Sequence, residues 1–401
     1  MLVRRSAFIK FRLSERPVPD LATLVSGDSK VVECQWEVLS AVTGRTLQVS
    51  DELVSALRSI PADQWTPSEK VLERHSNEVL RHLSEIGLVL CDSGDGSLRD
   101  YAEREEKLRE SAWHPISAIH HFCTKWRDVH LNVHVASDVI EVAQTDEDRA
   151  AVFDTFIDTY GMPPAHFSEN PNLSAGIELP FEKEDSELYN VLTRRRTSRI
   201  FDQNRKLSRS ELGKLCRYSF GPFGMFEAHP GIFGLGKTSP SGGGLHPTNI
   251  YVLVLRAEDL NPGIYFYDQE HHSVRLVVEM SIDEAMEQAN VLSAGQQYPR
   301  TAAALFLLTS RFYRNFWKYR KHPKAYAVLH MDLAHLSQTF YLVCEKLGLG
   351  AFFTAAVNSG NIEAILGLDP YEEGALAILG CGAASREQLG LRVDFEPFSP
   401  I

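Results

Sequence analysis

The sequence predicts a mixed α and β protein made of two globular parts. Over residues 185–401, helical stretches alternate with short runs rich in β-branched and aromatic residues. Over residues 1–165 the clearest signals are helical, and the last predicted helix covers residues 146–160. Residues 166–184 are polar and rich in turn-forming residues, so we expect a linker between the two domains there.

One helix of the N-terminal part is predicted to begin at Thr66. Thr66 and Glu69 have the spacing of a capping box, and Pro67 suits the first helical position. Gly87 is expected to end this helix, and residues 88–90 read as a short strand. Helix followed by strand predicts a winged-helix-like domain, which either grips a peptide or another macromolecule or has a purely structural role.

Five strand candidates and one long helix dominate the C-terminal part. The strand candidates share short, nearly continuous apolar runs, at residues 250–255, 264–268, 274–278, 304–309 and 375–380. Between the last two, apolar residues recur at helical spacing from Leu329 to Leu347, which predicts a core helix that ends at Gly348. This mixture indicates an α+β or α/β layered domain.

Composition excludes several classes of function. A formal charge of -12 repels phosphate backbones, so nucleic-acid binding is not expected. The chain lacks a secretory signal and any apolar run of roughly 18 residues, so we expect no membrane association and a cytoplasmic location. The six cysteines form no C-x-x-C pair, and the histidine-rich segment 113–134 lacks the spacing of a closed zinc site, so no metal is expected.

Residues 231–238 read GIFGLGKT, which has the spacing of a phosphate-binding P-loop. That mechanism requires a buried strand before the loop and a helix after it, so that backbone amides meet the phosphates. Here the flanking residues are rich in glycine and proline on both sides. We therefore reject a nucleotide-hydrolase function.

Two other segments carry candidate chemistry. Residues 185–202 are predicted as a helix that finishes in arginines around Thr197 and Ser198, which suits a phosphate dianion or, alternatively, a solvated basic face. Further on, glycines 242–244 would let the backbone approach a flat ring closely, unless they only form a flexible turn before a strand. A second helix should begin at the capping box of Ser208 and Glu211.

The two segments together carry a resemblance. R-R-T-S-R-I-F at 195–201, followed by P-S-G-G-G-L-H-P-T-N-I-Y at 240–251, resembles the nitroreductase superfamily, and more narrowly the SagB-type dehydrogenases. G-I-Y-F-Y-D at 263–268 and the Lys-Tyr pair at 318–319 follow in the order found in that family. The resemblance covers about residues 185–382.

The resemblance implies a nitroreductase-like FMN-binding fold, a homodimer, and a flavin site at specific positions. The implied FMN-binding residues are Arg195, Arg196, Thr197, Arg199, Pro240, Ser241, Gly242, Gly243, Leu245, Thr354, Ala355 and Ala356. The implied catalytic residues are Lys318 and Tyr319, either of which could act as the base. The last three FMN-binding positions are expected to form a turn after the core helix.

The implied reaction is oxidation of azolines to azoles in a ribosomally made precursor peptide, with a cyclodehydratase complex as a further partner. Arg320, Ala327 and Ala334 depart from the family pattern near the substrate face, so two alternatives stay open. One is an NAD(P)H-dependent reductase of dehydroalanine or nitro substrates. The other is a catalytically silent flavin- or peptide-binding partner of a maturation complex.

Overall fold

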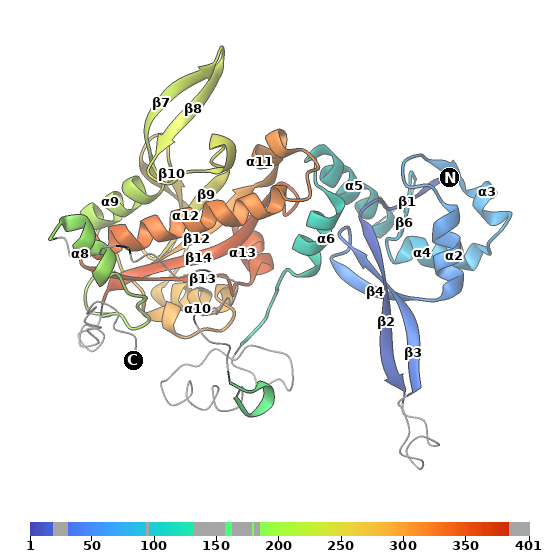
Figure 1. The fold of residues 1–401 in the computed structure, drawn as a ribbon, viewed down its shortest axis with the longest axis horizontal. Helices are drawn as coiled ribbons and strands as arrows, with labels where there is room; N and C mark the ends of the chain where they lie inside the picture. Colours follow the sequence, from blue (N-terminus) through green and yellow to red (C-terminus); the bar gives the residue numbers. More distant parts are fainter. Residues whose placement is uncertain (19–30, 94–95, 132–156, 163–178, 180–184, 385–401) are drawn as a thin grey trace.

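Six antiparallel strands form the central sheet of the C-terminal part (Figure 1). The structure is a computed structural model that describes residues 1–18, 31–93, 96–131, 157–162, 179 and 185–384. All neighbouring strands pair antiparallel, which confirms the α+β class. In spatial order they are β11 (Ser273–Glu279), β10 (Gly263–Asp268), β9 (Thr248–Val254), β12 (Ala304–Arg311), β14 (Glu373–Ala383) and β13 (Leu349–Thr354).

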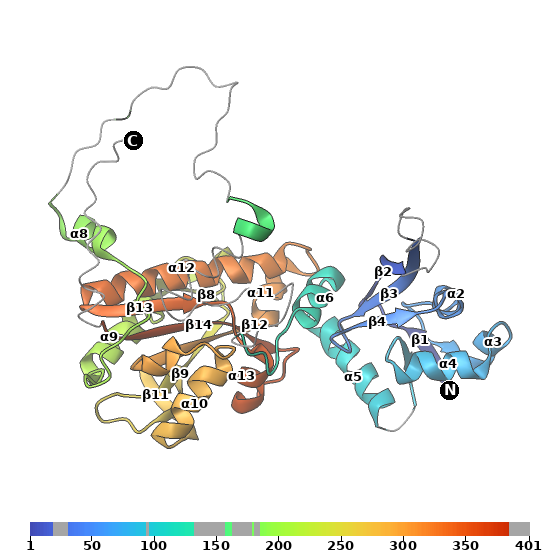
Figure 2. The ribbon, with the colours of Figure 1, turned by 90° about the horizontal axis from the view of Figure 1, so that it is seen from below.

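Helices cover both faces of this sheet, and each face has its own core. Successive residues of β12 point to opposite faces, so Phe306 and Leu308 lie in one core while Leu305 and Leu307 lie in the other. Helix α12 closes the first core and α10 closes the second, on opposite sides of the sheet in Figure 2. The covering helices are α9 (Arg209–Ser219) and α12 (Ala325–Lys346) on one face, α10 (Ile282–Leu292) and α13 (Ser359–Leu366) on the other.

Helix α12 is the core helix that the sequence predicts. Its residues Leu329, Leu333, Leu336 and Phe340 are buried, and Gly348, at φ +69°, follows its last turn as expected. Within the described residues, no helix is both long enough and apolar enough to cross a membrane.

Two small sheets and several helices form the N-terminal part. Strand β1 (Leu2–Arg5) pairs with β5 (Thr66–Pro67) on one side and β6 (Val89–Cys91) on the other. Helices pack on this sheet, and the winged-helix-like domain stays a prediction. The remaining elements are α2 (Asp51–Ser59), α3 (Ser68–Leu72), α4 (Asn77–Glu85) and a second sheet of β2 (Ile9–Val18), β3 (Val31–Ser40) and β4 (Arg45–Val49).

The structure divides the helix that was predicted to begin at Thr66: α3 begins at Ser68, close to the predicted start, but it ends at Leu72 and has no side-chain cap, so the predicted length and cap are wrong. Thr66 lies in β5, where it pairs with Val3 of β1. The longer helix, α4, begins after Ser76, whose hydroxyl accepts the Val79 amide at 3.2 Å. Pairing with a distant strand outweighs the local capping signal at Thr66, and a serine ten residues later caps the helix instead.

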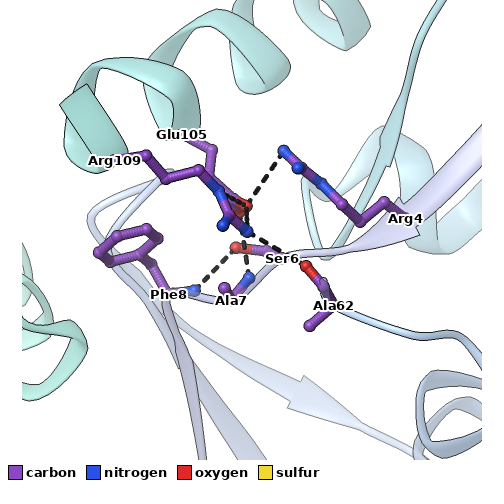
Figure 3. A network of polar contacts seen from close by, with 7 residues as sticks. All are labelled: Arg4, Ser6, Ala7, Phe8, Ala62, Glu105 and Arg109. Carbon is purple, nitrogen blue, oxygen red and sulfur yellow. Dashed lines mark hydrogen bonds and ion pairs between the residues drawn. The ribbon is translucent and has the colours of Figure 1, made fainter. Parts of the chain in front are cut away.

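A buried carboxylate ties helix α5 (Ser97–Glu110) to the first strand of the chain (Figure 3). Glu105 is fully buried, and its Oε1 lies 3.3 Å from Arg4 Nη2 and 2.7 Å from Arg109 Nη2. Its other oxygen accepts the Ala7 amide at 3.1 Å. Two cations and one amide therefore compensate a charge that would be costly to bury alone.

The end of the N-terminal part packs directly on the C-terminal part, through α6 (Pro115–Cys123) and the residues before it (Figure 1). The Trp113 ring centroid lies 4.6 Å from that of Phe312 and 4.8 Å from that of Phe316. Both phenylalanines belong to α11 (Phe312–Tyr319). Apart from residue 179, the predicted linker lies outside the described residues, and so does most of the helix predicted over 146–160.

Candidate active site

The arginine-rich segment leaves its helix and follows the edge of the central sheet. Helix α8 (Glu187–Arg194) ends well before the predicted end of the helix over 185–202, so that helix was predicted too long. The next residues are extended: Thr197 forms a bridge with Ala351 of β13, and the Ser198 amide donates to the Ala351 carbonyl at 2.7 Å. Because β13 is the edge strand, its outer carbonyls compete with helix formation for these amides.

Two of the arginines lie over tyrosine rings. The Arg195 guanidinium is 5.3 Å from the centroid of Tyr341, and that of Arg199 is 5.8 Å from the centroid of Tyr298. The Thr197 hydroxyl lies 3.3 Å from the Tyr341 hydroxyl. We call Arg195, Thr197 and Arg199 the arginine group.

Arg196 has a different environment from the arginine group. Its guanidinium donates to the carbonyls of Thr193 at 2.7 Å and Arg195 at 2.8 Å. It therefore stabilises the carbonyl end of α8, in the way cations commonly do at helix C-termini.

Gln296 and Tyr298 connect the segment Thr354–Ala356 to the arginine group, because Tyr298 lies under Arg199 and bonds to Gln296. Gln296 Nε2 donates to the Thr354 hydroxyl at 3.3 Å and to the Ala356 carbonyl at 3.0 Å, and the Tyr298 hydroxyl donates to Gln296 Oε1 at 2.6 Å. Residues 354–356 were expected to form a turn, but Thr354 is the last residue of strand β13. Ala355 and Ala356 follow the strand.

The glycine-rich loop forms a single 3₁₀ turn before β9. The turn is η1 (Gly242–Gly244), whose last two glycines have φ of +64° and +69°, a region that other residues strongly disfavour. The Ser241 hydroxyl donates to Asp332 Oδ2 at 2.5 Å, and the first glycine amide donates to Oδ1 at 2.8 Å. At the far end, Arg314 Nε donates to the Leu245 carbonyl at 2.9 Å. The loop is therefore fixed at both ends, unlike a flexible turn.

Lys318 and Tyr319 lie against this loop at the end of α11. A Cβ atom placed on Gly243 would lie 2.9 Å from Lys318 Nζ and 3.1 Å from the Tyr319 hydroxyl. One placed on Gly242 would lie 3.6 Å from the same hydroxyl. Lys318 is exposed and Tyr319 half-buried. The structure thus brings an amine and a phenol, both able to exchange protons, against the backbone of Gly243.

A small cavity of about 10 Å³ lies behind the loop, which is room for about one water. Burial lowers the pKa of Lys237 to about 8, and repulsion from Arg311 adds to this. Burial also lowers the pKa of His246, while the Asp332 carboxylate opposes that change. The residues that bring polar or charged groups to the cavity include Ser241, Lys237, His246 and Asp332, with Pro240 beside them.

The arginine group and the loop contact opposite flanks of α12. The loop is bound to Asp332, whereas Thr197 contacts Tyr341, nine positions later. At 3.6 residues per turn, nine residues make two and a half turns, so the two side chains point in nearly opposite directions about 13 Å apart along the axis. Within one chain the two groups therefore do not form one continuous site.

The G-x-x-x-x-G-K-T run lies in a β-hairpin, which confirms that it is not a P-loop. Strands β7 (Pro222–His229) and β8 (Ile232–Lys237) project from the body of the protein in Figure 1. Lys237 turns inward, and its Nζ donates to the Phe220 carbonyl at 2.8 Å. The Thr238 hydroxyl donates to the Tyr218 carbonyl at 2.6 Å. Both polar side chains thus anchor the base of the hairpin.

Comparison with known protein families gives a match to the C-terminal part of the chain. The sequence profile of the Nitroreductase family matches residues 192–383, from the end of α8 to the end of β14. We call residues 192–383, which are just under half of the chain, the nitroreductase domain after this match. The nitroreductase domain includes the whole central sheet, the arginine group, the glycine-rich loop and the Lys-Tyr pair, whereas the N-terminal part lies outside the match.

Two related sequences and one solved structure are similar to this chain. The trifolitoxin-processing protein TfxB of Rhizobium leguminosarum bv. trifolii is 33% identical over 146 residues, which are 36% of this chain and 38% of TfxB. The nitroreductase-type protein MJ1384 of Methanocaldococcus jannaschii is 27% identical over 195 residues, 49% of this chain and 91% of that protein. The match to TfxB thus spans well under half of that relative's length.

The solved structure is a chain of the E. coli microcin synthetase McbBCD complex with truncated pro-MccB17 bound. It superposes with a TM-score of 0.50 at 18% identity, and the alignment covers 70% of this chain and 97% of that one. At this identity the likeness concerns the fold alone. The coverage exceeds the segment 192–383, so the shared fold includes residues outside the nitroreductase domain.

Several residues of the candidate site were not found from the sequence. Tyr298, Tyr341 and Gln296 contact the predicted residues only through long-range folding, and their sequence surroundings carry no signal. Asp332 has a signal in retrospect, because it is an acid three positions after Leu329 and four before Leu336, on the apolar stripe of a core helix. A buried acid in such a helix requires partners that satisfy it.

Proposed function

We propose that this protein is an FMN-dependent oxidoreductase that converts azolines to azoles in a ribosomally synthesised peptide. The observation that carries the proposal is the contact of Lys318 and Tyr319 with Gly243 of the glycine-rich loop. An amine and a phenol stand where a flat ring can approach the backbone, so a proton acceptor lies beside the expected place of the flavin. The nitroreductase-family domain supports the same assignment.

The chemistry of the two groups fits FMN. The arginine group offers two guanidinium forks and a hydroxyl, which suit a phosphate dianion. At the loop, a Cβ on Gly242 would come within 2.2 Å of Val328 Cγ1, so Val328 packs closely on this glycine, whereas a Cβ on Gly244 would meet nothing within 4 Å among the described residues. When bound, FMN would accept the hydride.

The reaction divides naturally between the cofactor and the protein. Oxidation of an azoline ring removes a hydride from one carbon and a proton from the neighbouring carbon, and a ring double bond forms between them. The proton passes to the deprotonated form of Lys318 or of Tyr319, which both lie at the loop. The same pair would deliver a proton if the site ran in reverse.

A second copy of the chain is proposed to complete the FMN site. The arginine group and the loop lie on opposite flanks of α12, so the loop of one copy would face the arginine group of the other. Helix α12 is apolar on most sides, and such helices are normally buried all round. Its exposed stripe consists of Ala327, His330, Met331, Ala334, His335 and Gln338. A homodimer would cover this stripe.

The N-terminal part is proposed to bind the precursor peptide, with a cyclodehydratase as a further partner of the assembly. This proposal is prompted by TfxB, a trifolitoxin-processing protein, and by the McbBCD complex, which was determined with truncated pro-MccB17 bound. A cytoplasmic location would suit the free cysteines of the described chain.

The experiment that tests the reaction supplies an azoline-containing peptide to the purified protein with FMN and oxygen. The proposal predicts loss of two hydrogen atoms per ring by mass spectrometry. Gain of two hydrogens by a dehydroalanine peptide with NAD(P)H would favour the reductase instead. A flavin-loaded protein that changes neither substrate, yet retains the peptide, would favour the silent partner.

A further inference from the structure

Asp332 is a buried acid that is linked by hydrogen bonds to both ends of the glycine-rich loop. It is 3% exposed and lies on the flank of α12 that faces the loop. One carboxylate oxygen accepts the Ser241 hydroxyl at 2.5 Å, and the other accepts the Gly242 amide at 2.8 Å. Both oxygens are therefore used to hold two successive residues at the start of the loop.

The same chain of hydrogen bonds reaches the end of the loop. The Ser241 hydroxyl accepts the His246 amide at 2.9 Å while it donates to Asp332. His246 has φ +46°, a left-handed conformation that is strained for a residue with a side chain. The bond from its amide to Ser241 helps to hold this conformation. Asp332 thus fixes residues 241, 242 and 246 together, with the glycines between them.

A carboxylate suits this place better than a neutral acceptor. Hydrogen bonds to an ionised acceptor are shorter and stronger than neutral ones. Lys237 and His246 line the same cavity as Asp332, and the Asp332 carboxylate opposes the lowering effect of Lys237 on the pKa of His246. Leu336 and Ile250 are apolar neighbours in the same cavity, and Thr248 and Gln269 add further polar side chains there.

We infer that Asp332 is the positioning residue that fixes the glycine-rich loop in the shape required to receive FMN against Lys318 and Tyr319. The inference rests on the proposed function for the identity of the ligand. Asp332 contacts the loop rather than the expected ring, so it acts through Ser241 and Gly242. In its absence the Gly242 amide and the Ser241 hydroxyl would have to find other acceptors, and the loop would exchange between conformations.

The test compares full-length Asp332→Ala and Asp332→Asn with the wild type and with Ser337→Ala. Ser337 is on the same helix, and its hydroxyl donates only one turn back, to the Ala334 carbonyl at 2.9 Å. Two quantities are measured for each protein: amide hydrogen exchange of the peptide covering residues 240–246, and the Kd for FMN by fluorescence quenching. Thermal unfolding of each apoprotein shows whether the global fold is kept.

Asp332→Ala should accelerate exchange in residues 240–246 and raise the FMN Kd, each by about tenfold or more. Asp332→Asn should lie between it and the wild type, because the amide oxygen still accepts one donor. Ser337→Ala should match the wild type in both quantities. Unchanged exchange in the loop of a folded Asp332→Asn and Asp332→Ala would overturn the inference. If the wild type binds no FMN, the proposed function fails, while the exchange experiment still decides whether Asp332 fixes the loop.

Discussion

His121 Nδ1 and the Tyr326 hydroxyl lie 2.8 Å apart, and this buried hydrogen bond joins the two halves of the chain. His121 is on α6 of the N-terminal part, and Tyr326 is in the first turn of α12. Beside it, the Lys321 amide donates to the Ala112 carbonyl at 3.1 Å. The N-terminal part therefore contacts the connection between Lys318–Tyr319 and the central helix directly.

Tyr326→Phe should destabilise the protein by about 1–3 kcal/mol, because it leaves a buried imidazole nitrogen without its partner. The measurement is the free energy of unfolding from urea titration. Tyr313→Phe is the matched control, since Tyr313 is 48% exposed on the neighbouring helix and should cost less than about 0.5 kcal/mol. Equal effects of the two variants would contradict the importance of the bond.

Stability should fall as the pH decreases below 6.5, in part through His121. Burial lowers the pKa of His121 well below 6.5, and the nearby charges of Lys125, His330 and His120 add to this. The unfolded chain therefore takes up a proton at this residue at a higher pH than the folded protein, so acid favours unfolding. The decrease in unfolding free energy between neutral pH and a pH below 6.5 should be smaller in His121→Gln. A decrease identical to the wild type would show that His121 does not contribute.

Gly243→Ala should abolish FMN binding, whereas Gly348→Ala should not. Both glycines have positive φ, +64° and +69°, so both variants pay a backbone cost of about 1–2 kcal/mol. Only at Gly243 would the new Cβ meet Lys318 and Tyr319, and at Gly348 it meets nothing within 4 Å among the described residues. Thermal unfolding and FMN titration separate the two effects. Retention of FMN by Gly243→Ala would contradict the proposed approach of the ring.

At least one of the variants Lys318→Ala and Tyr319→Phe should lower kcat for azoline oxidation by about 100-fold or more. Both variants should still bind FMN. The reason is that each variant removes a proton-exchanging group at the loop while the arginine group stays intact. Arg320→Ala, at the next position, serves as the control, because the Arg320 guanidinium donates to the Trp317 carbonyl at 3.0 Å. If neither variant lowered kcat, the proton would have to be taken by another group.

Met331→Arg should convert a dimer to a monomer and remove FMN in the same step. Met331 is 60% exposed in the middle of the α12 stripe, where a charge would have to be buried in the proposed interface. Leu276→Arg, on the outer strand β11 and 53% exposed, should leave both properties unchanged. Light scattering gives the mass, and absorption gives the flavin content. A monomeric wild type with FMN bound would contradict a shared site.

Local signals in the sequence predicted the elements that depend on neighbouring residues. The capping box of Ser208 and Glu211 is present with both of its hydrogen bonds, and the run ALFLLT is the central strand β12. Such elements are encoded within one or two turns of chain. The resemblance also located the loop and Lys318–Tyr319, which the structure brings together.

Long-range pairing explains what the sequence did not predict. Thr66 joins a strand from the start of the chain instead of beginning a helix, and the arginine segment joins the edge of β13 at Ala351. The partners of the candidate site are equally distant: Ser241 and Asp332 are 91 positions apart, and Thr197 and Tyr341 are 144 apart. A single sequence contains no local pattern that links such pairs.

The most direct test of the central claim is the absorption spectrum of the purified protein, with mass identification of whatever heat releases from it. The account predicts a flavin spectrum and released FMN, retained in Lys318→Ala and lost when Arg195 and Arg199 are both replaced by alanine. A colourless protein that excess FMN does not reconstitute would contradict it.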